Sequence, residues 1–326
     1  MKAAIIGIAG TELDAGEAAL LRAQAPAGVI LFGRNVSSPA QLRALCAALR
    51  RVLPPGAVLM VDQEGGRVAR LRPPHWRGHP PAAALGALFA RDMAAGLRAA
   101  WLTGALIGLD CAAMGFDTVC APVLDRAVAG AHGVIGDRAF AADPAVVARL
   151  GRALAAGLLA AGVIPVGKHA PGHGQARVDS HHDLPVVADA GPDLVPFAAN
   201  ADLPAMMTAH ITYPAWDGAR PATLSPVVVR EIIRGRLGFA GLLVSDDLAM
   251  QALAGAPAAR ARAALAAGCD IALYCPGSGN AAVLEAVGDL TPAASARLGA
   301  AHALASARRL ALDPAALGAE RDGLAL

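Results

Sequence analysis

Short apolar segments of strand length recur eight times along the chain, and this recurrence limits the possible folds more than any other feature. They are residues 3–9, 28–32, 57–62, 117–122, 162–167, 204–210, 241–246 and 270–275. Segments with helical spacing alternate with them, at 39–51, 91–114, 144–161, 225–236, 257–267, 280–287 and 292–310. Alternating β and α units imply a parallel sheet. Eight such units predict a closed (β/α)₈ barrel of the TIM type rather than an open doubly wound sheet.

Length and composition agree with one large domain. The chain has 326 residues, 56% of them hydrophobic, which is ample for the core of a barrel. We expect a single catalytic domain over 1–326, with a C-terminal tail after about residue 310. Neither a Gly-x-Gly-x-x-Gly motif nor a P-loop occurs, so the sequence signals no dinucleotide or nucleoside triphosphate, and we expect no cofactor.

Charge and apolar runs exclude several kinds of partner. The formal net charge is +2 and no basic block stands out, so nucleic acid is not an expected partner. The longest uncharged run, 153–167, is shorter than the roughly 20 residues that span a bilayer. The N-terminus lacks a basic region before its apolar run, and the five cysteines show no CxxC spacing. We therefore expect a cytoplasmic protein with reduced thiols, and a monomer as the default oligomeric state.

Polar residues gather where the predicted strands end. Asp62, Lys168, His169, His210 and Asp246 each lie at the C-terminal end of a strand segment. In a (β/α)₈ barrel, this is the face on which active sites are built. The predicted site is therefore at this end of the barrel.

The first of these places reads VDQEGGRVARLR (61–72). An acid at a strand end, two glycines and two arginines suggest a tight turn that a ligand can approach closely. Such a site would suit a polyhydroxyl ligand, with Asp62 accepting from two hydroxyls and Arg70 donating. A solvated loop with an ion pair is the plain structural alternative, and the spacing alone leaves both open.

The second reads KHAPGHGQARVDSHHDLP (168–185) and holds four histidines. Because Asp179 lies two residues before His181, both side chains share a face in an extended stretch. The carboxylate would then orient the imidazole and favour its protonated form, as a general acid requires. Metal binding by His169, His173 and His181 is the alternative, but neither HxH nor HExxH occurs, so we expect no metal.

The third reads VSDDLAM (244–250). Adjacent residues on a strand point to opposite faces, so Asp246 and Asp247 cannot both face the barrel axis. One should face the axis and the other should cap the following helix.

Six segments together resemble the bacterial β-N-acetylglucosaminidases of glycoside hydrolase family 3. They are GVILFGRNV (28–36), VDQEGGRVARL (61–71), APVLD with GVIGDRAF (121–125, 133–140), KHAPGHGxxxxDSHxxLP (168–185), MMTAHITYP (206–214) and 220–250, which ends in SDDLAM. The resemblance covers most of residues 3–280. Ala170 stands where the family usually has Phe, and His182-Asp183 replace more variable residues.

The resemblance implies a role for each matching residue. Asp246 matches the nucleophile, and His181, paired with Asp179, matches the general acid/base. The residues that match the binding site of the non-reducing N-acetylglucosamine are Asp62, Arg70, Arg138, Lys168 and His169.

The resemblance thus implies a retaining exo-β-N-acetylglucosaminidase of peptidoglycan recycling, which forms a covalent glycosyl-aspartate. Its small-molecule substrate would be GlcNAc linked to 1,6-anhydro-MurNAc, with or without peptide. Only 3% of residues are aromatic, which argues against a stacking platform for a long polymer. A metal-dependent barrel hydrolase and a non-catalytic sugar-binding protein are the alternatives.

Overall fold

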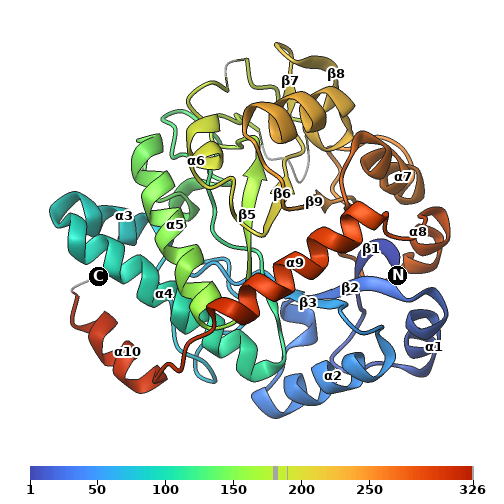
Figure 1. Ribbon diagram of the computed structural model, residues 1–326, viewed down its shortest axis with the longest axis horizontal. Helices are drawn as coiled ribbons and strands as arrows, with labels where there is room; N and C mark the ends of the chain where they lie inside the picture. The colour runs from blue at the N-terminus through green and yellow to red at the C-terminus, as the bar shows by residue number, and fades with distance from the viewer. Residues whose placement is uncertain (179–182, 189, 325–326) are drawn as a thin grey trace.

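The computed structural model describes residues 1–178, 183–188 and 190–324, and its centre is a closed barrel of parallel strands. Strand β1 pairs with both β2 and the last strand, β10, for instance through Ile5 and Leu273, which closes the sheet. This confirms the predicted (β/α)₈ architecture (Figure 1). The barrel strands are β1 (Lys2–Gly7), β2 (Pro26–Leu31), β3 (Val58–Val61), β4 (Thr118–Val119), β5 (Ile164–Ala170), β6 (Ala205–Thr208), β9 (Leu242–Asp247) and β10 (Ile271–Tyr274).

Helices surround the barrel, as Figure 1 shows. They are α1 (Ala15–Gln24), α2 (Pro39–Val52), α3 (Ala82–Arg91), α4 (Met93–Met114), α5 (Pro144–Ala160), α6 (Leu194–Ala199), α7 (Pro257–Ala267), α8 (Asn280–Ala286), α9 (Pro292–Arg308) and α10 (Pro314–Asp322). Several begin at recognisable signals. Ser38, Asp143 and Thr291 each accept a hydrogen bond from a first-turn N–H, and a proline follows each of them at the first helical position.

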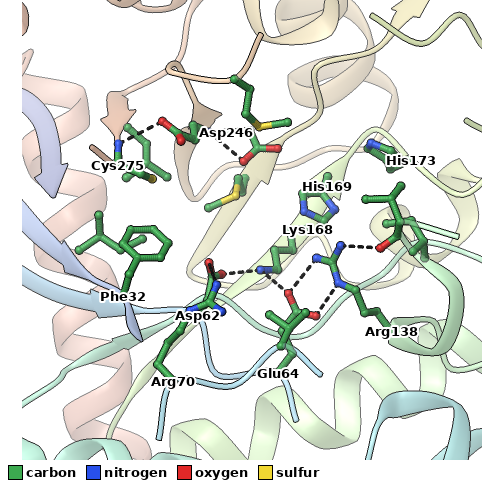
Figure 2. A pocket seen from close by; sticks show the side chains of 18 of the residues that line it. Phe32, Asp62, Glu64, Arg70, Arg138, Lys168, His169, His173, Asp246 and Cys275 are labelled. Atoms are coloured by element: carbon green, nitrogen blue, oxygen red, sulfur yellow. Dashed lines mark hydrogen bonds and ion pairs between the residues drawn. The ribbon is translucent and has the colours of Figure 1, made fainter. Parts of the chain in front are cut away.

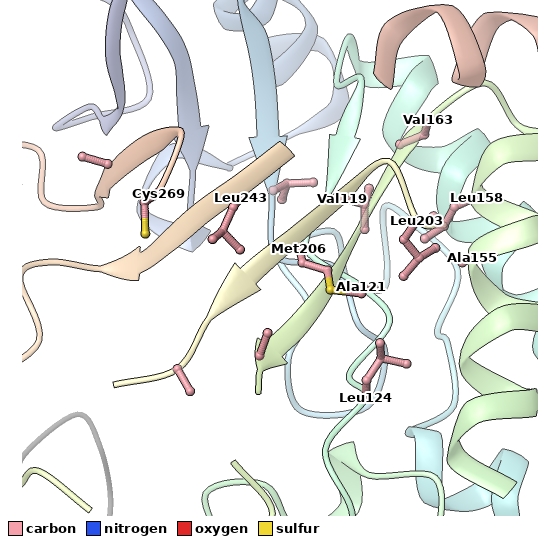
Figure 3. Close-up of a cluster of buried hydrophobic side chains, with 14 of the residues drawn as sticks. Val119, Ala121, Leu124, Ala155, Leu158, Val163, Leu203, Met206, Leu243 and Cys269 are labelled. Carbon is pink, nitrogen blue, oxygen red and sulfur yellow. The ribbon is translucent and has the colours of Figure 1, made fainter. Parts of the chain in front are cut away.

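Alternate strand residues build two separate apolar layers. Every second residue points into the barrel, where Ile5, Met60 and Val244 belong to one buried cluster. Leu298 of α9 belongs to the same cluster, so this helix closes the N-terminal end of the barrel. The other strand residues pack outward against the helices, as the side chains of Met206 on β6 and Leu158 on α5 do (Figure 3).

Helices α4 and α5 approach each other unusually closely. A Cβ on Gly104 would collide with the carbonyl oxygen of Leu154, and one on Gly157 would collide with that of Trp101. Helix α4 is also long and apolar enough to cross a membrane, with a mean hydropathy of 1.3, but 61% of its most apolar window is buried inside the protein. It is therefore a core helix of the barrel layer.

Several elements differ from the expectations. Helices α1, α3, α6 and α10 and the hairpin β7 (Thr212–Tyr213) with β8 (Asp217–Pro221) were not predicted, because their apolar periodicity is weak or their length is short. The segment expected as a helix at 225–236 is a π-helix, η4 (Val228–Arg236). The C-terminal tail forms α10, which lies beside α4 (Figure 1).

Candidate active site

A cavity of about 310 Å³ opens at the C-terminal ends of the barrel strands, opposite α9 (Figure 2). Both charged and apolar residues line it. Its lining includes Ile30, Phe32, Asp62, Glu64, Arg67, Arg70, Val134, Ile135, Arg138, Lys168, His169, His173, Met207, Asp246, Asp247, Met250 and Cys275.

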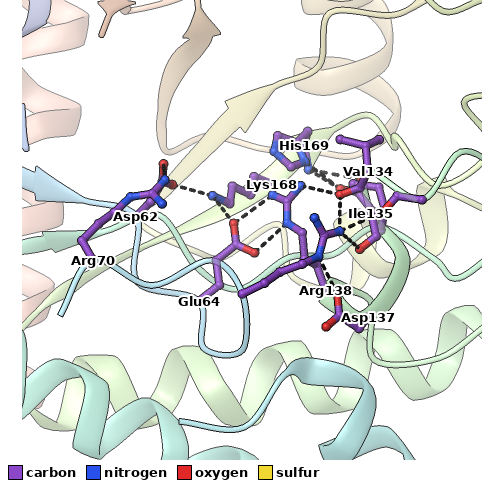
Figure 4. Close-up of polar contacts among 12 residues, drawn as sticks. Asp62, Glu64, Arg70, Val134, Ile135, Asp137, Arg138, Lys168 and His169 are labelled. Atoms are coloured by element: carbon purple, nitrogen blue, oxygen red, sulfur yellow. Dashed lines mark hydrogen bonds and ion pairs between the residues drawn. The ribbon is translucent and has the colours of Figure 1, made fainter. Parts of the chain in front are cut away.

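Lys168 lies at the centre of the charged residues. Its Nζ is 2.7 Å from Oδ1 of Asp62 and 2.6 Å from Oε1 of Glu64 (Figure 4). Arg138 donates two hydrogen bonds to Glu64, each 2.8 Å long, and Arg70 donates one of 3.2 Å to Asp62. Three cations and two carboxylates thus form one network along the cavity wall, with Lys168 and Glu64 buried at its centre.

These groups are fixed in their charged forms. Burial alone would raise the pKa of the Asp62 carboxyl, but the charges of Lys168 and Arg70 outweigh it and hold that pKa well below its usual range. For Lys168, burial lowers the pKa, while Asp62 and Glu64 raise it to a value well above that of a free lysine. The network therefore offers fixed hydrogen-bond donors and acceptors rather than groups that exchange protons.

The turn after β3 brings Glu64 to the wall. Gly65 has a φ of 103°, and a Cβ at that position would collide with the carbonyl oxygen of Pro80, so the turn requires glycine. The buried Gln63 side chain accepts hydrogen bonds from the N–H groups of Arg70 and Leu71, at 2.7 and 3.0 Å. This bridge folds the loop back and directs Arg70 towards Asp62.

One N–H donor of Arg70 is not used within the protein. Its Nε is buried and has no hydrogen-bond partner within the described ranges, while its guanidinium lies 5.4 Å from the centre of the Phe32 ring. A buried donor of this kind is costly unless a ligand or water accepts from it. The structural alternative for this segment was an ion pair in a solvated loop. Arg70 does form an ion pair with Asp62, but both residues line the cavity.

His169 is held by a carboxylate that the sequence reasoning missed. Its Nδ1 is 2.7 Å from Oδ2 of Asp125, and the N–H of His173 donates to Oδ1 of the same carboxylate at 2.6 Å. With Nδ1 engaged, Nε2 of His169 is the ring nitrogen left for a ligand in the cavity. His173 also lines the cavity, and burial lowers the pKa of its imidazole to about 4.

Asp246 and Asp247 both line the cavity at the end of β9. Burial raises the pKa of Asp246, but the interactions with His169 and Lys168 and the hydrogen bond from the N–H of Asp247 outweigh it and lower that pKa below its usual value. Asp247 accepts from the N–H groups of Ala249 and Cys275, at 2.9 and 3.0 Å, and burial raises its pKa. The expectation that one of the pair caps a helix was wrong, because Asp247 caps the turn after β9 and α7 begins only at Pro257.

The family model described as "Glycosyl hydrolase family 3 N terminal domain" matches residues 4–310. A beta-hexosaminidase of Alkalilimnicola ehrlichii is 44% identical over 308 residues, which cover 91% of this chain and 88% of that protein. One from Thiobacillus denitrificans is 45% identical over 83% of this chain and 77% of its own. The chain belongs to glycoside hydrolase family 3.

Solved structures of the family agree with the fold of this glycoside hydrolase. NagZ from Neisseria gonorrhoeae in complex with N-trifluoroacetyl-D-glucosamine is 33% identical, with a TM-score of 0.88 over 99% of this chain and 98% of that one. The Beta-N-acetylhexosaminidase from Beutenbergia cavernae is 30% identical, with a TM-score of 0.76 over 97% and 96%. The comparisons support N-acetylglucosaminidase activity of the family 3 type.

The cavity brings together most of the residues singled out in this family 3 sequence. Asp62, Arg70, Arg138, Lys168, His169 and Asp246 line it, whereas Asp179 and His181 lie outside the described residues. Within the described part of the chain, no group of three or more His, Cys, Asp or Glu side chains is arranged to hold a metal. Glu64 and Asp125 were missed, although each follows a strand segment within a motif that was noted, VDQEGG and APVLD.

Proposed function

We propose that this family 3 enzyme is a retaining exo-β-N-acetylglucosaminidase. The observation that carries the proposal is the position of Asp246, an ionised carboxylate on a rigid strand, in the same cavity as the network of Asp62, Glu64, Arg70, Arg138 and Lys168. The network supplies charge-assisted donors and acceptors for sugar hydroxyls. The volume of the cavity, about 310 Å³, is at the small end of the usual range for ligand pockets. A cavity of this size favours one terminal sugar over an internal segment of a polymer.

In the proposed mechanism, Asp246 attacks the anomeric carbon and forms a glycosyl-enzyme ester while the bond to the leaving oxygen breaks. The low pKa of Asp246 keeps it ionised and ready for this attack. The resemblance to the family assigns the proton transfer to His181, with Asp179 favouring its protonated form. In the second step His181 takes a proton from water, and the water oxygen displaces Asp246 from the sugar.

The proposed substrate is a short muropeptide, GlcNAc linked to 1,6-anhydro-MurNAc, handled in the cytoplasm during peptidoglycan recycling. The small cavity and the scarcity of aromatic residues, 3% of the chain, support a small soluble substrate. Comparison of kcat/KM for this disaccharide with that for a chitin oligomer tests the preference. A higher value for the oligomer would contradict the proposed substrate but not the activity.

Hydrolysis of para-nitrophenyl β-GlcNAc by the wild type and by Asp246→Ala tests the activity. We expect turnover by the wild type and a loss of about 10³-fold or more in the variant, as for a covalent catalyst. No turnover by the wild type would favour the non-catalytic sugar-binding protein. Inactivation by a chelator, reversed by added metal, would favour the metal-dependent hydrolase.

A further inference from the structure

His210 lies behind the cavity, and the proposed mechanism does not use it. Its side chain is fully buried and does not line the cavity. Its Nε2 is 2.9 Å from the carbonyl oxygen of Asp247, and its Nδ1 is 2.8 Å from the hydroxyl of Thr223. Both ring nitrogens are therefore engaged immediately beside Asp246.

Two buried threonines extend these contacts to the other side of Asp246. The hydroxyls of Thr223 and Thr208 are 2.8 Å apart, and the backbone N–H of Asp246 donates to Oγ1 of Thr208 at 3.3 Å. Three side chains thus link the N–H of Asp246 to the carbonyl of Asp247. Together with the backbone between these two atoms, they form a closed ring of hydrogen bonds, which we call the nucleophile ring.

The donors in the nucleophile ring can be assigned by counting protons. The carbonyl of Asp247 only accepts, so Nε2 of His210 must carry a hydrogen. A neutral imidazole has a single N–H, so its Nδ1 accepts from the hydroxyl of Thr223. Thr223 then accepts from the hydroxyl of Thr208, which in turn accepts from the N–H of Asp246. All four bonds run in one direction, and each hydroxyl donates once.

Two contacts compete with this arrangement. The hydroxyl of Thr223 is also 3.0 Å from the carbonyl oxygen of Ala209, and the hydroxyl of Thr208 also contacts the thiol of Cys269. If either hydroxyl donated there, Nδ1 of His210 would need a hydrogen as well, and the imidazole would be an imidazolium. Burial lowers the pKa of the His210 imidazole, which opposes the charged form. The neutral arrangement therefore fits both the contacts and the burial.

We propose that His210, as the neutral tautomer protonated at Nε2, is a positioning residue that holds Asp246 through Thr223 and Thr208. The inference rests on the proposed function, since it takes Asp246 as the nucleophile. The nucleophile ring fixes the backbone on both sides of Asp246, and the N–H of Asp247 donates to Oδ1 of Asp246 at 2.8 Å. The attacking carboxylate is thereby held in one orientation, and a displacement of about 1 Å can cost about 100-fold in rate.

Kinetics of ring variants test this role. In Thr223→Val and His210→Leu, we expect kcat for para-nitrophenyl β-GlcNAc, and the rate of covalent labelling by a mechanism-based fluoro-glycoside, to fall about 10- to 100-fold. KM and inhibition by GlcNAc should stay within about twofold, because no sugar-binding group is changed. His210→Gln should recover most of the rate, since its amide can donate to Asp247 and accept from Thr223.

Thr103→Val is the matched control. Thr103 is fully buried in α4, and its hydroxyl has no hydrogen-bond partner in the described part of the chain. We expect this variant to keep the wild-type kcat. Equal losses of kcat in Thr103→Val and Thr223→Val would show that the effect is general destabilisation and would overturn the proposal, as would wild-type kcat in His210→Leu.

The tautomer is tested on the unaltered enzyme, so poor folding of a variant does not prevent a decision. Nitrogen-15 NMR of the histidines should show one imidazole that is neutral and protonated at Nε2 at pH 7, and its signal should be absent from His210→Gln. An imidazolium or an Nδ1–H form at His210 overturns the proposal. If Asp246→Ala remains active while the tautomer is as stated, the proposed function fails and the hydrogen-bond assignment stands.

Discussion

The backbone N–H of Asp247 donates a 2.8 Å hydrogen bond to Oδ1 of Asp246, yet burial and charge shift the two carboxyl pKa values in opposite directions. Burial raises both. For Asp246, the interactions with His169 and Lys168 and the hydrogen bond from the N–H of Asp247 outweigh this effect of burial, whereas burial dominates for Asp247. Adjacent acids on one strand thus differ: the pKa of Asp246 is lowered, whereas Asp247 has a raised pKa and accepts hydrogen bonds from the backbone N–H groups of Ala249 and Cys275.

We expect a mechanism-based fluoro-glycoside to label Asp246 and not Asp247. Asp246→Asn should lose about 10³-fold or more in kcat, because an amide cannot form the ester. Asp247→Asn keeps an oxygen that can accept from Ala249 and Cys275, so its kcat should fall by no more than about tenfold. Mass spectrometry of the labelled peptides measures the first outcome. A label on Asp247 would show that the assignment is reversed.

The network around Lys168 should also determine stability. In Lys168→Met, Asp62 and Glu64 lose the cation that lies 2.7 and 2.6 Å away, while Lys168 itself is only 3% exposed. Removing one partner of a buried ion pair leaves charge uncompensated, and we expect the free energy of unfolding to fall by about 3–5 kcal/mol. Urea unfolding measures this change.

Arg230→Met is the matched control for that experiment. Arg230 forms an ion pair of 2.9 Å with Glu231, but the two side chains are 71% and 57% exposed. An exposed pair of this kind contributes between about 0 and 1 kcal/mol. If Lys168→Met destabilised the protein no more than Arg230→Met does, the network around Lys168 would contribute no more stability than an exposed ion pair.

Periodicity predicted the barrel strands because each is a short apolar run with a helix or loop after it. The strand ends in turn placed Asp62, Lys168 and Asp246 at one face, since parallel strands share their C-terminal edge. Glu64 was not predicted, because its place depends on how the turn at Gly65 packs against Pro80, a contact made by a residue 15 positions along the chain.

The contacts that hold His169 and Asp247 from behind the cavity were even harder to predict from the sequence. Asp125 reaches His169 across β4 and β5, and His210 reaches Asp247 across β6 and β9. These pairs depend on which strands are neighbours and on their register, and no local motif encodes either. His210 was noted at a strand end, but nothing in its own segment distinguishes a cavity residue from one behind the cavity.

Stability should fall in acid through the buried imidazoles. Burial lowers the pKa of His173 to about 4 from an ordinary value of 6.5. Between these two values the unfolded chain binds a proton that the folded protein does not, so stability decreases as pH falls from 6.5 to about 4. The shift corresponds to about 3 kcal/mol in the free energy of unfolding. This contribution is fully present above pH 7 and fully lost below pH 4.

We therefore expect His173→Gln to lose less stability than the wild type between pH 7 and pH 4. Urea unfolding at several pH values measures both proteins, and the values above pH 7 correct for any general effect of the substitution. Burial also lowers the pKa values of His79 and His210, so some acid sensitivity should remain in the variant. An unchanged pH dependence in His173→Gln would contradict this role of His173.

The C-terminal helix α10 should affect substrate binding through the loop after β3. Nη1 of Arg321 lies 3.1 Å from Nδ1 of His79, whose Nε2 is 3.1 Å from Asp110 on α4. The carbonyl oxygen of His79 accepts from the N–H of Gly66 at 2.9 Å, and Gly66 follows the turn that presents Glu64 to the cavity. A continuous series of hydrogen bonds thus joins α10 to the charged wall.

In Arg321→Met, this support is lost, and we expect KM for para-nitrophenyl β-GlcNAc to rise several-fold while kcat stays within about twofold, as for a loss of uniform binding. The free energy of unfolding should also fall by about 1–3 kcal/mol, because Nδ1 of the buried His79 loses its partner. Glu320→Gln is the control on the same helix, since it removes only an exposed ion pair with Arg98 and should leave KM unchanged. Equal KM values for Arg321→Met and the wild type would show that α10 stabilises the barrel without acting on the loop after β3.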